Sequence, residues 1–128
     1  NFFQQNPEIK YDKDWLNYFE VDINEVIKKN QVVFLDITAD WCATCQFNKV
    51  NVLNSDRVIK LFEDNDILLV RADWTRPNVK INIFLEQYDR FGIPFNAFFS
   101  HNFPNGILLS ELLSEKEIVN TISKINNE

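Results

Sequence analysis

The sequence has 128 residues, of which 45% are hydrophobic, and a formal net charge of −6. This length and composition fit one domain with a continuous core, and the acidic balance gives no basic surface for nucleic acid. The apolar runs VVFL and ILLV are far shorter than the ~20 residues that span a bilayer, and no signal peptide opens the chain, so we expect a soluble domain. The chain contains no methionine and begins with Asn1, so we also expect a piece of a longer protein.

The sequence pattern at the beginning of the chain predicts a short polar segment, after which the domain begins. The polar residues 1–14 are predicted to be a lead-in or linker, and residues 15–128 to form the domain itself. The segment WLNYFEV favours a short strand. In DINEVIKKN, Asp22 can cap a helix and Glu25 follows three residues later, which is typical of a short helix.

The middle of the chain alternates between buried strands and helices. QVVFLDITA lacks clean polar alternation, which indicates a central strand covered on both faces, and residues 43–53 are the next candidate helix. Ser55 can cap a further helical turn. DILLVRADW is a second buried strand, after which Pro77 suits the first position of a helix. The apolar residues of that helix have a spacing that should lay it flat on a sheet: Ile81, Phe84, Leu85 and Tyr88.

The last part of the chain predicts two strands and a helix. FNAFFS follows Pro94 and is predicted to be a strand, HNFPNG a turn, and ILLSEL the final strand. The final helix begins with a capping box from Ser114 to Glu117. The whole pattern predicts an α/β fold in which a central mixed β-sheet is flanked by helices on both faces and closed by a hairpin edge.

The cysteines, Cys42 and Cys45, are separated by two residues in DITADWCATC and leave three alternatives open. A zinc site needs about four ligands, so it would require His101 and a carboxylate, or a second chain. A purely structural disulfide would close a very short loop and remove little chain entropy. The third alternative is redox chemistry, because residues three apart near a helix start have Cβ atoms ~5–6 Å apart and can be joined without refolding.

The placement of the pair after a strand favours the redox alternative. If the strand ends at ADW, Cys42 lies at the N-cap or first turn of the next helix, where free N–H groups and the helix dipole stabilise a thiolate. We therefore expect an exposed Cys42 that ionises more readily than a free thiol and acts as the nucleophile. Cys45, one turn further and more buried, is expected to keep its proton and to resolve the mixed disulfide.

The strand VVFLDITA, the segment ADWCATC and a later GIP occur in an order that resembles the thioredoxin superfamily. With RADWT after the next strand, the sequence looks most like the C-terminal thioredoxin-like domain of the DsbD family of membrane thiol:disulfide interchange proteins. The resemblance covers roughly residues 20–125. It implies a thioredoxin-like fold and a thiol:disulfide oxidoreductase, or protein-disulfide reductase, with no cofactor beyond the Cys42–Cys45 disulfide. The alternatives are a free-standing thioredoxin-like reductase and a module that only binds a partner or a metal.

The resemblance also implies roles for single residues. In the superfamily the proline that matches Pro94 is cis, and the backbone before it pairs with the bound partner, so Ile93 and Pro94 take that substrate-binding role; an ordinary trans loop proline is the alternative. Asp36, six residues before Cys42, matches a buried acid beneath the active site. In an apolar strand it would hold its proton tightly and exchange it with Cys45. The alternative is a solvated or capping aspartate at a strand end.

Three further residues near the pair carry expectations. Trp41 is expected to shield the thiols and shape the docking surface, or to pack in the core. Ala43-Thr44 stands where ordinary thioredoxins have Gly-Pro, which favours the DsbD-like branch. Lys49 stands where DsbD relatives often carry a carboxylate, so a relay through a second acid is in doubt. Lys49 either assists ionisation of the thiols or is exposed to solvent.

The resemblance finally implies the partners and the location of the domain. The partners are protein thiols and disulfides, among them the transmembrane and N-terminal domains of a membrane-embedded parent protein, in a role that extends to cytochrome c biogenesis. The domain would then lie on the periplasmic face of a bacterial inner membrane. Nucleic acid and metal are not expected.

Overall fold

The computed structural model describes residues 14–128. The predicted lead-in at residues 1–14 lies outside these residues except for Asp14, so the domain boundary stays a prediction. The elements follow one another in this order: strand β1 (Leu16–Asn17), 3-10 helix η1 (Tyr18–Glu20), helix α2 (Ile23–Lys28), strand β2 (Val33–Thr38), helix α3 (Ala43–Asn48), π-helix η2 (Lys49–Leu53), helix α4 (Asp56–Asp64), strand β3 (Leu68–Asp73), helix α5 (Val79–Gln87), strand β4 (Phe95–Ser100), strand β5 (Phe103–Leu108) and helix α6 (Glu115–Asn126).

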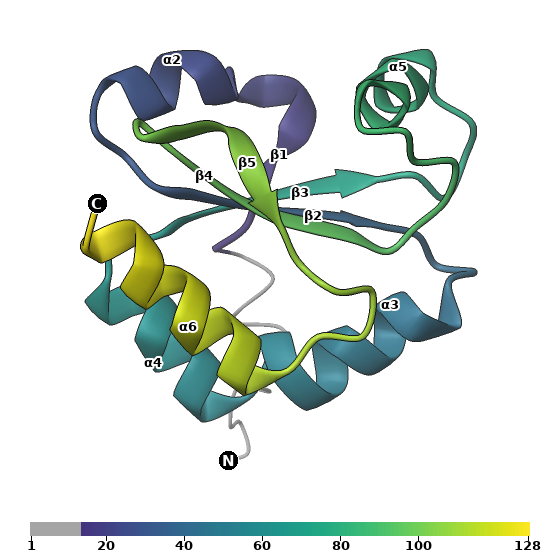
Figure 1. The fold of residues 1–128 in the computed structure, drawn as a ribbon. Coiled ribbons are helices and arrows are strands. Elements are labelled where there is room, and N and C mark those ends of the chain that lie inside the picture. Colours follow the sequence, from purple (N-terminus) through teal and green to yellow (C-terminus); the bar gives the residue numbers. More distant parts are fainter. Residues whose placement is uncertain (1–13) are drawn as a thin grey trace.

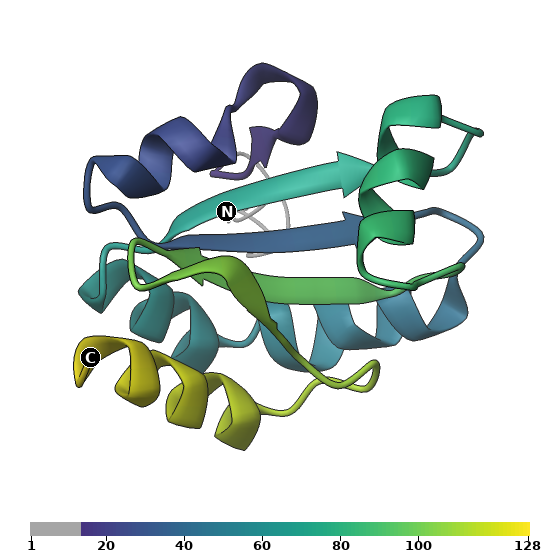
Figure 2. The same ribbon diagram turned by 45° about the horizontal axis from the view of Figure 1, so that its top comes forward.

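Within residues 14–128 the strands form a mixed five-stranded sheet in the order β1-β3-β2-β4-β5. Strand β2 lies at the centre, parallel to β3 and antiparallel to β4. Helices α3, α4 and α6 cover one face of the sheet, and α2 and α5 cover the other (Figures 1 and 2). The predicted α/β fold with helices on both faces is therefore confirmed.

Each face of the sheet has its own apolar core, and strand β2 contributes to both. Phe34 packs with Phe62 and Phe98 on the side of α4 and α6. Leu35 packs with Ile81 on the side of α2 and α5. All residues of β2 are buried, because a central strand covered on both faces has no solvent-facing side. This placement brings the carboxyl ends of β2 and β3 to the same edge, where the loop that carries the two cysteines begins.

The structure confirms the predicted beginnings of three helices, for which Asp22, Ser55 and Ser114 are the N-caps. Each of these side chains accepts a hydrogen bond from the backbone N–H three residues later, at 3.2, 3.3 and 3.1 Å respectively. Short polar side chains at this position satisfy one of the N–H groups that a helix start leaves free. These capping signals are local in the sequence, which is why they could be identified without knowledge of the fold.

One predicted strand is shorter than expected, and one predicted helix start is wrong. The strand predicted in WLNYFEV covers only Leu16–Asn17, because the Asn17 side chain accepts from the backbone N–H of Phe19 and starts the 3-10 helix η1. Helix α5 begins at Val79, after Pro77 rather than with it. Asn78 is its cap and accepts from the backbone N–H of Ile81 over 3.1 Å, and asparagine is among the strongest N-cap residues.

The predicted last strand is also displaced along the chain. Strand β5 runs over Phe103–Leu108, so most of the segment predicted as a turn is strand. Pro104 is tolerated because β5 is an edge strand that pairs only with β4 among the described residues. Gly106 has a φ of +88°, and a Cβ built there would lie 2.8 Å from Cε1 of Phe99. Among residues 14–128, every helix falls short of the length or apolar character needed to cross a membrane.

Candidate functional site

The two cysteines lie where the loop after β2 turns into α3. Cys42 is the N-cap of α3, and its Sγ accepts a hydrogen bond from the backbone N–H of Cys45 over 3.1 Å. The two residues form a disulfide, with their Cα atoms 5.2 Å apart. The loop is tightened around Ala39, whose carbonyl oxygen accepts from the backbone N–H of Cys42 and from the Gln46 side chain, at 3.2 and 2.9 Å. The predicted position of Cys42 at the helix start is therefore confirmed.

Both cysteines are buried, which corrects the expectation of an exposed Cys42. The exposed fraction is 6% for Cys42 and 2% for Cys45. Ala39 and the partly buried Ile93 pack against the pair, and this tertiary packing could not be read from the spacing of the cysteines. The Ile93–Pro94 peptide bond is cis, and Pro94 is buried. Ile93 thus brings the segment that precedes Pro94 next to the disulfide.

Trp41 lies at the surface, so packing in the core is excluded for it. Its side chain is 61% exposed, yet its orientation is fixed, because the indole Nε1–H donates to the carbonyl oxygen of Thr75 over 3.0 Å. The ring centroids of Trp41 and Trp74 are 6.3 Å apart. A cavity of about 340 Å³ lies beside them, lined by these two indoles with Thr75, Pro77 and Asn82.

A second loop, after β3, holds the cysteine loop in place. The backbone N–H of Asp40 donates to Oγ1 of Thr75 over 2.9 Å. Thr75 in turn donates its backbone N–H and its hydroxyl to Oδ1 of Asp73, at 2.9 and 2.6 Å. The Thr75 hydroxyl lowers the pKa of Asp73; partial burial opposes this shift, whereas the Thr75 backbone N–H and the positive charge of the half-buried Lys49 support it.

Asp73 and Thr75 were missed as site residues by sequence reasoning. The spacing Asp-x-Thr was nevertheless available as a signal, because an aspartate that accepts from the N–H two residues later forms an Asx turn. What the sequence did not indicate is the partner of that turn. Thr75 lies 35 residues from Asp40 along the chain, and only the parallel pairing of β2 with β3 brings them together.

Asp36 is buried in the central strand between two polar partners. Its exposed fraction is 3%, Arg71 Nε lies 3.0 Å from its Oδ2, and Asn96 Nδ2 donates to its Oδ1 over 2.8 Å. The alternative of a solvated aspartate at a strand end is therefore wrong, and the carboxylate is buried in the strand, where Arg71 and Asn96 are its polar partners. Asp36 lies two residues after Phe34 and so on the same face of β2, the face covered by α3, α4 and α6 (Figure 1).

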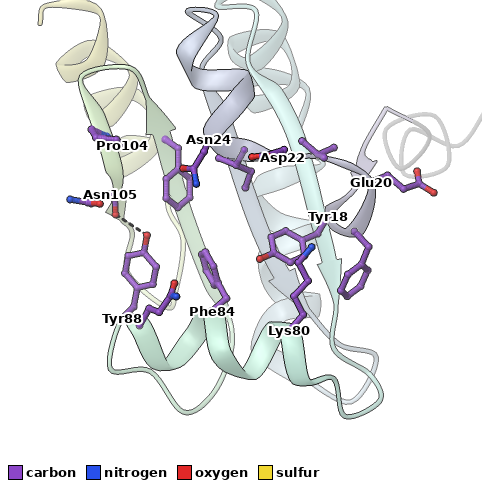
Figure 3. A pocket seen from close by; sticks show the side chains of 14 residues that line it. Tyr18, Glu20, Asp22, Asn24, Lys80, Phe84, Tyr88, Pro104 and Asn105 are labelled. Atoms are coloured by element: carbon purple, nitrogen blue, oxygen red, sulfur yellow. Dashed lines mark hydrogen bonds between the residues drawn. The ribbon is translucent and has the colours of Figure 1, made fainter.

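Within residues 14–128, no group of three or more His, Cys, Asp and Glu side chains is arranged to hold a metal ion. His101, the ligand that a zinc site would have needed, is exposed in the turn between β4 and β5. A larger cavity of about 700 Å³ lies on the other face of the sheet, between the η1–α2 segment and α5 (Figure 3). Burial raises the pKa of Tyr18 and Tyr88, which line it, and its lining includes no residue of the cysteine loop.

The chain was compared with family models, with curated proteins and with solved structures, and each comparison found similar proteins. A family model described as thioredoxin-like matches residues 14–100. DsbD, the thiol:disulfide interchange protein of Campylobacter jejuni (strain RM1221), is 25% identical over 88 residues, which are 69% of this chain and 15% of that protein. The oxidised C-terminal domain of Neisseria meningitidis DsbD has a TM-score of 0.65 at 20% identity, over 80% of this chain and 88% of that one. A Thermus thermophilus thioredoxin has a TM-score of 0.64 at 17% identity, over 87% of this chain and 85% of that one.

Proposed function

The chain belongs to the thioredoxin-like family, and from this we propose that it is a thiol:disulfide oxidoreductase domain whose exchanging pair is Cys42 and Cys45. The observation that carries the proposal is the disulfide between these residues at the start of α3. The backbone N–H of Cys45 donates to Cys42 Sγ, and a donor in this position stabilises a thiolate on Cys42 once the disulfide is reduced.

The proposed reaction transfers two electrons from the reduced pair to a partner disulfide. The Cys42 thiolate attacks one sulfur of the partner, a Cys42–partner disulfide forms, and the second partner sulfur leaves as a thiolate. Cys45 then loses its proton and attacks Cys42 Sγ. The Cys42–partner bond breaks, the partner leaves as a dithiol after protonation, and the domain is left with the Cys42–Cys45 disulfide.

The surface around the pair supports docking of another protein. Trp41 is 61% exposed and Phe91 is 84% exposed, and both lie close in the chain to residues that pack on or form the disulfide. Apolar side chains that gather on one surface are typical of sites that bind a partner, and the packing of Ile93 on the disulfide brings the segment of Phe91 towards that of Trp41. We assign Ile93 and Pro94 to the binding of the partner backbone, because Ile93 packs against the pair and Pro94 is buried directly after it.

Besides Cys42 and Cys45, we assign Asp36 to the chemical steps of the exchange. It is the acid that the resemblance pairs with Cys45, and it lies on the sheet face beneath α3. We propose that it accepts the Cys45 proton before the second attack, either directly or through water. Its bonds to Arg71 and Asn96 hold the carboxylate in one orientation, which suits a group that has to exchange a proton at a fixed place.

For the parent protein we propose a DsbD-type relay. The similarity to DsbD of C. jejuni and to the N. meningitidis DsbD domain supports it. The domain would receive electrons from a transmembrane domain and pass them to an N-terminal domain on the periplasmic face of a bacterial inner membrane. After reduction with a membrane-impermeant phosphine, Cys42 of the parent protein should then react with a membrane-impermeant maleimide when only the outer membrane is permeabilised. Labelling that requires lysis of the inner membrane would contradict this location.

The exchange itself is tested by trapping the intermediate. In Cys45→Ser the second attack cannot occur, so a covalent Cys42–partner disulfide should accumulate when the reduced variant meets a protein disulfide, and mass spectrometry should locate it on Cys42. The matched variant Cys42→Ser removes the nucleophile and should trap little. Equal trapping by both variants, or none by Cys45→Ser, would overturn the proposed function.

A further inference from the structure

The loop after β3 fixes the position of the cysteine loop through one threonine. The carbonyl oxygen of Thr75 accepts the indole N–H of Trp41 at 3.0 Å, and its hydroxyl oxygen accepts the backbone N–H of Asp40 at 2.9 Å. These two contacts hold the two residues that immediately precede Cys42. The backbone N–H of Trp74 donates to the carbonyl oxygen of Thr38 over 2.7 Å, so the two loops are also joined at their bases.

The direction of the hydroxyl bonds follows from Asp73. A carboxylate only accepts hydrogen bonds, so the proton of the Thr75 hydroxyl points to Oδ1 of Asp73 at 2.6 Å. A lone pair on the hydroxyl oxygen is then free for the Asp40 N–H. The backbone N–H of Thr75 bonds the same carboxylate oxygen, which fixes the turn. A serine at position 75 can make the same bonds, whereas an isosteric valine can make neither hydroxyl bond.

We propose that Thr75 is a positioning residue for exchange with protein disulfides. Its hydroxyl fixes the backbone of Asp40 and, through Asp73, the turn whose carbonyl oxygen holds Trp41 in the orientation in which its exposed face meets a docking partner beside Cys42. This inference rests on the proposed exchange at Cys42. An indole that is 61% exposed would otherwise sample several rotamers, and binding would have to order it. A small disulfide needs only the sulfur of Cys42, so it should depend little on Thr75.

The test compares Thr75→Val with Thr75→Ser in the complete 128-residue chain. Each variant is assayed with insulin as a protein disulfide, with dithiothreitol supplied to regenerate the reduced pair in every turnover. The reduced variant is also assayed in a single turnover with 5,5′-dithiobis(2-nitrobenzoate) as a small disulfide. We expect Thr75→Val to lower kcat/KM for insulin about tenfold, mainly through KM, because the docking surface is no longer pre-ordered. The rate with the small disulfide should change less than about twofold, and Thr75→Ser should stay near the unmodified chain with both.

Thr121→Val is the matched control. Its hydroxyl donates to the carbonyl oxygen of Glu117 within helix α6, outside both loops, so its loss should leave both rates unchanged. Asp73→Asn keeps the turn but removes the charged acceptor, and it should raise the KM for insulin about threefold. It serves as the decisive variant if Thr75→Val does not fold.

Several results would overturn the positioning role. The first is an unchanged KM for insulin in Thr75→Val or, if that variant does not fold, in Asp73→Asn. The second is a loss of kcat/KM for insulin in Thr75→Ser as large as that in Thr75→Val. The third is a loss of rate with the small disulfide as large as the loss with insulin. If the unmodified chain reduces neither disulfide, the proposed function itself fails. If it reduces both and Thr75→Val matches it, only the role of Thr75 fails.

Discussion

Arg71 and Asp36 are register partners on β3 and β2 and form an ion pair on the sheet face that α3, α4 and α6 cover, with Nε 3.0 Å from Oδ2. Their side chains are only 15% and 4% exposed. The guanidinium also lies over the ring of Trp15, with Cζ 3.9 Å from the ring centroid. A charge buried to this extent depends on its partner, because removing one member leaves the other without compensation.

Replacing Arg71 should therefore destabilise the fold strongly. We expect Arg71→Met, which keeps the apolar stem, to lower the free energy of unfolding by about 3 kcal/mol in urea denaturation. The matched variant is Arg57→Met. Arg57 pairs with Glu115 over 3.0 Å, but its side chain is 81% exposed, so the loss should stay below about 1 kcal/mol. Equal losses in the two variants would contradict the structural importance of the buried pair.

Asp36 should act on the second step of the exchange. If it accepts the proton of Cys45, Asp36→Asn should slow the release of the partner from the Cys42–partner disulfide about 100-fold, while capture of the partner stays near its normal rate. Rapid acid quenching followed by mass spectrometry measures the two steps separately. Asp40→Asn, in the exposed part of the same loop, is the control. Normal release in Asp36→Asn would leave Asp36 with a structural role only.

The two glycines of the chain should respond in opposite ways to alanine. At Gly106 the φ of +88° and the contact of 2.8 Å with Phe99 make a Cβ unfavourable, so Gly106→Ala should cost about 2 kcal/mol or more. At Gly92 an added Cβ meets nothing within 4 Å, so Gly92→Ala should be neutral or stabilise by up to about 1 kcal/mol. Urea denaturation compares them, and a similar loss in both would contradict the assigned conformation of β5.

What the sequence predicted well depends on short-range signals. The caps at Asp22, Ser55 and Ser114 act within three residues, and the continuous apolar run around Phe34 and Leu35 is sufficient to indicate a central strand. The displaced strand β5 has the opposite cause. Pro and Gly are the strongest turn signals, and their use inside an edge strand depends on a neighbouring strand that the local sequence does not specify.

The site could be predicted only where it depends on short-range signals. The position of Cys42 at a helix start follows from the order strand, loop, helix, and the structure has it there. The burial of Cys42 depends on Ile93, and the orientation of Trp41 depends on Thr75. Each of these contacts joins segments that are more than 30 residues apart in the sequence. A tertiary contact of this kind is not encoded in spacing or composition.

The lowered pKa of Asp73 predicts a specific loss of stability in acid. Its pKa lies below the ordinary value of 3.8 in the folded chain, chiefly because the Thr75 hydroxyl bonds the carboxylate. The folded state therefore gains stability from ionised Asp73 above that value, and the gain disappears as the pH falls through the lowered folded pKa. In urea denaturation, Asp73→Asn should be less stable than the unmodified chain at neutral pH. A difference that does not shrink below pH 3.8 would contradict the assigned bond.

The most direct test of the exchange mechanism is the ionisation of Cys42 in reduced Cys45→Ser, where Cys42 is the only cysteine. The rate of its alkylation by iodoacetamide is measured against pH, with the same variant unfolded in urea as the reference. Because the backbone N–H at position 45 donates to Cys42 Sγ, the folded variant should show a midpoint clearly below that of a free thiol, which is about 8.5. A folded midpoint equal to or above the unfolded one would contradict the mechanism.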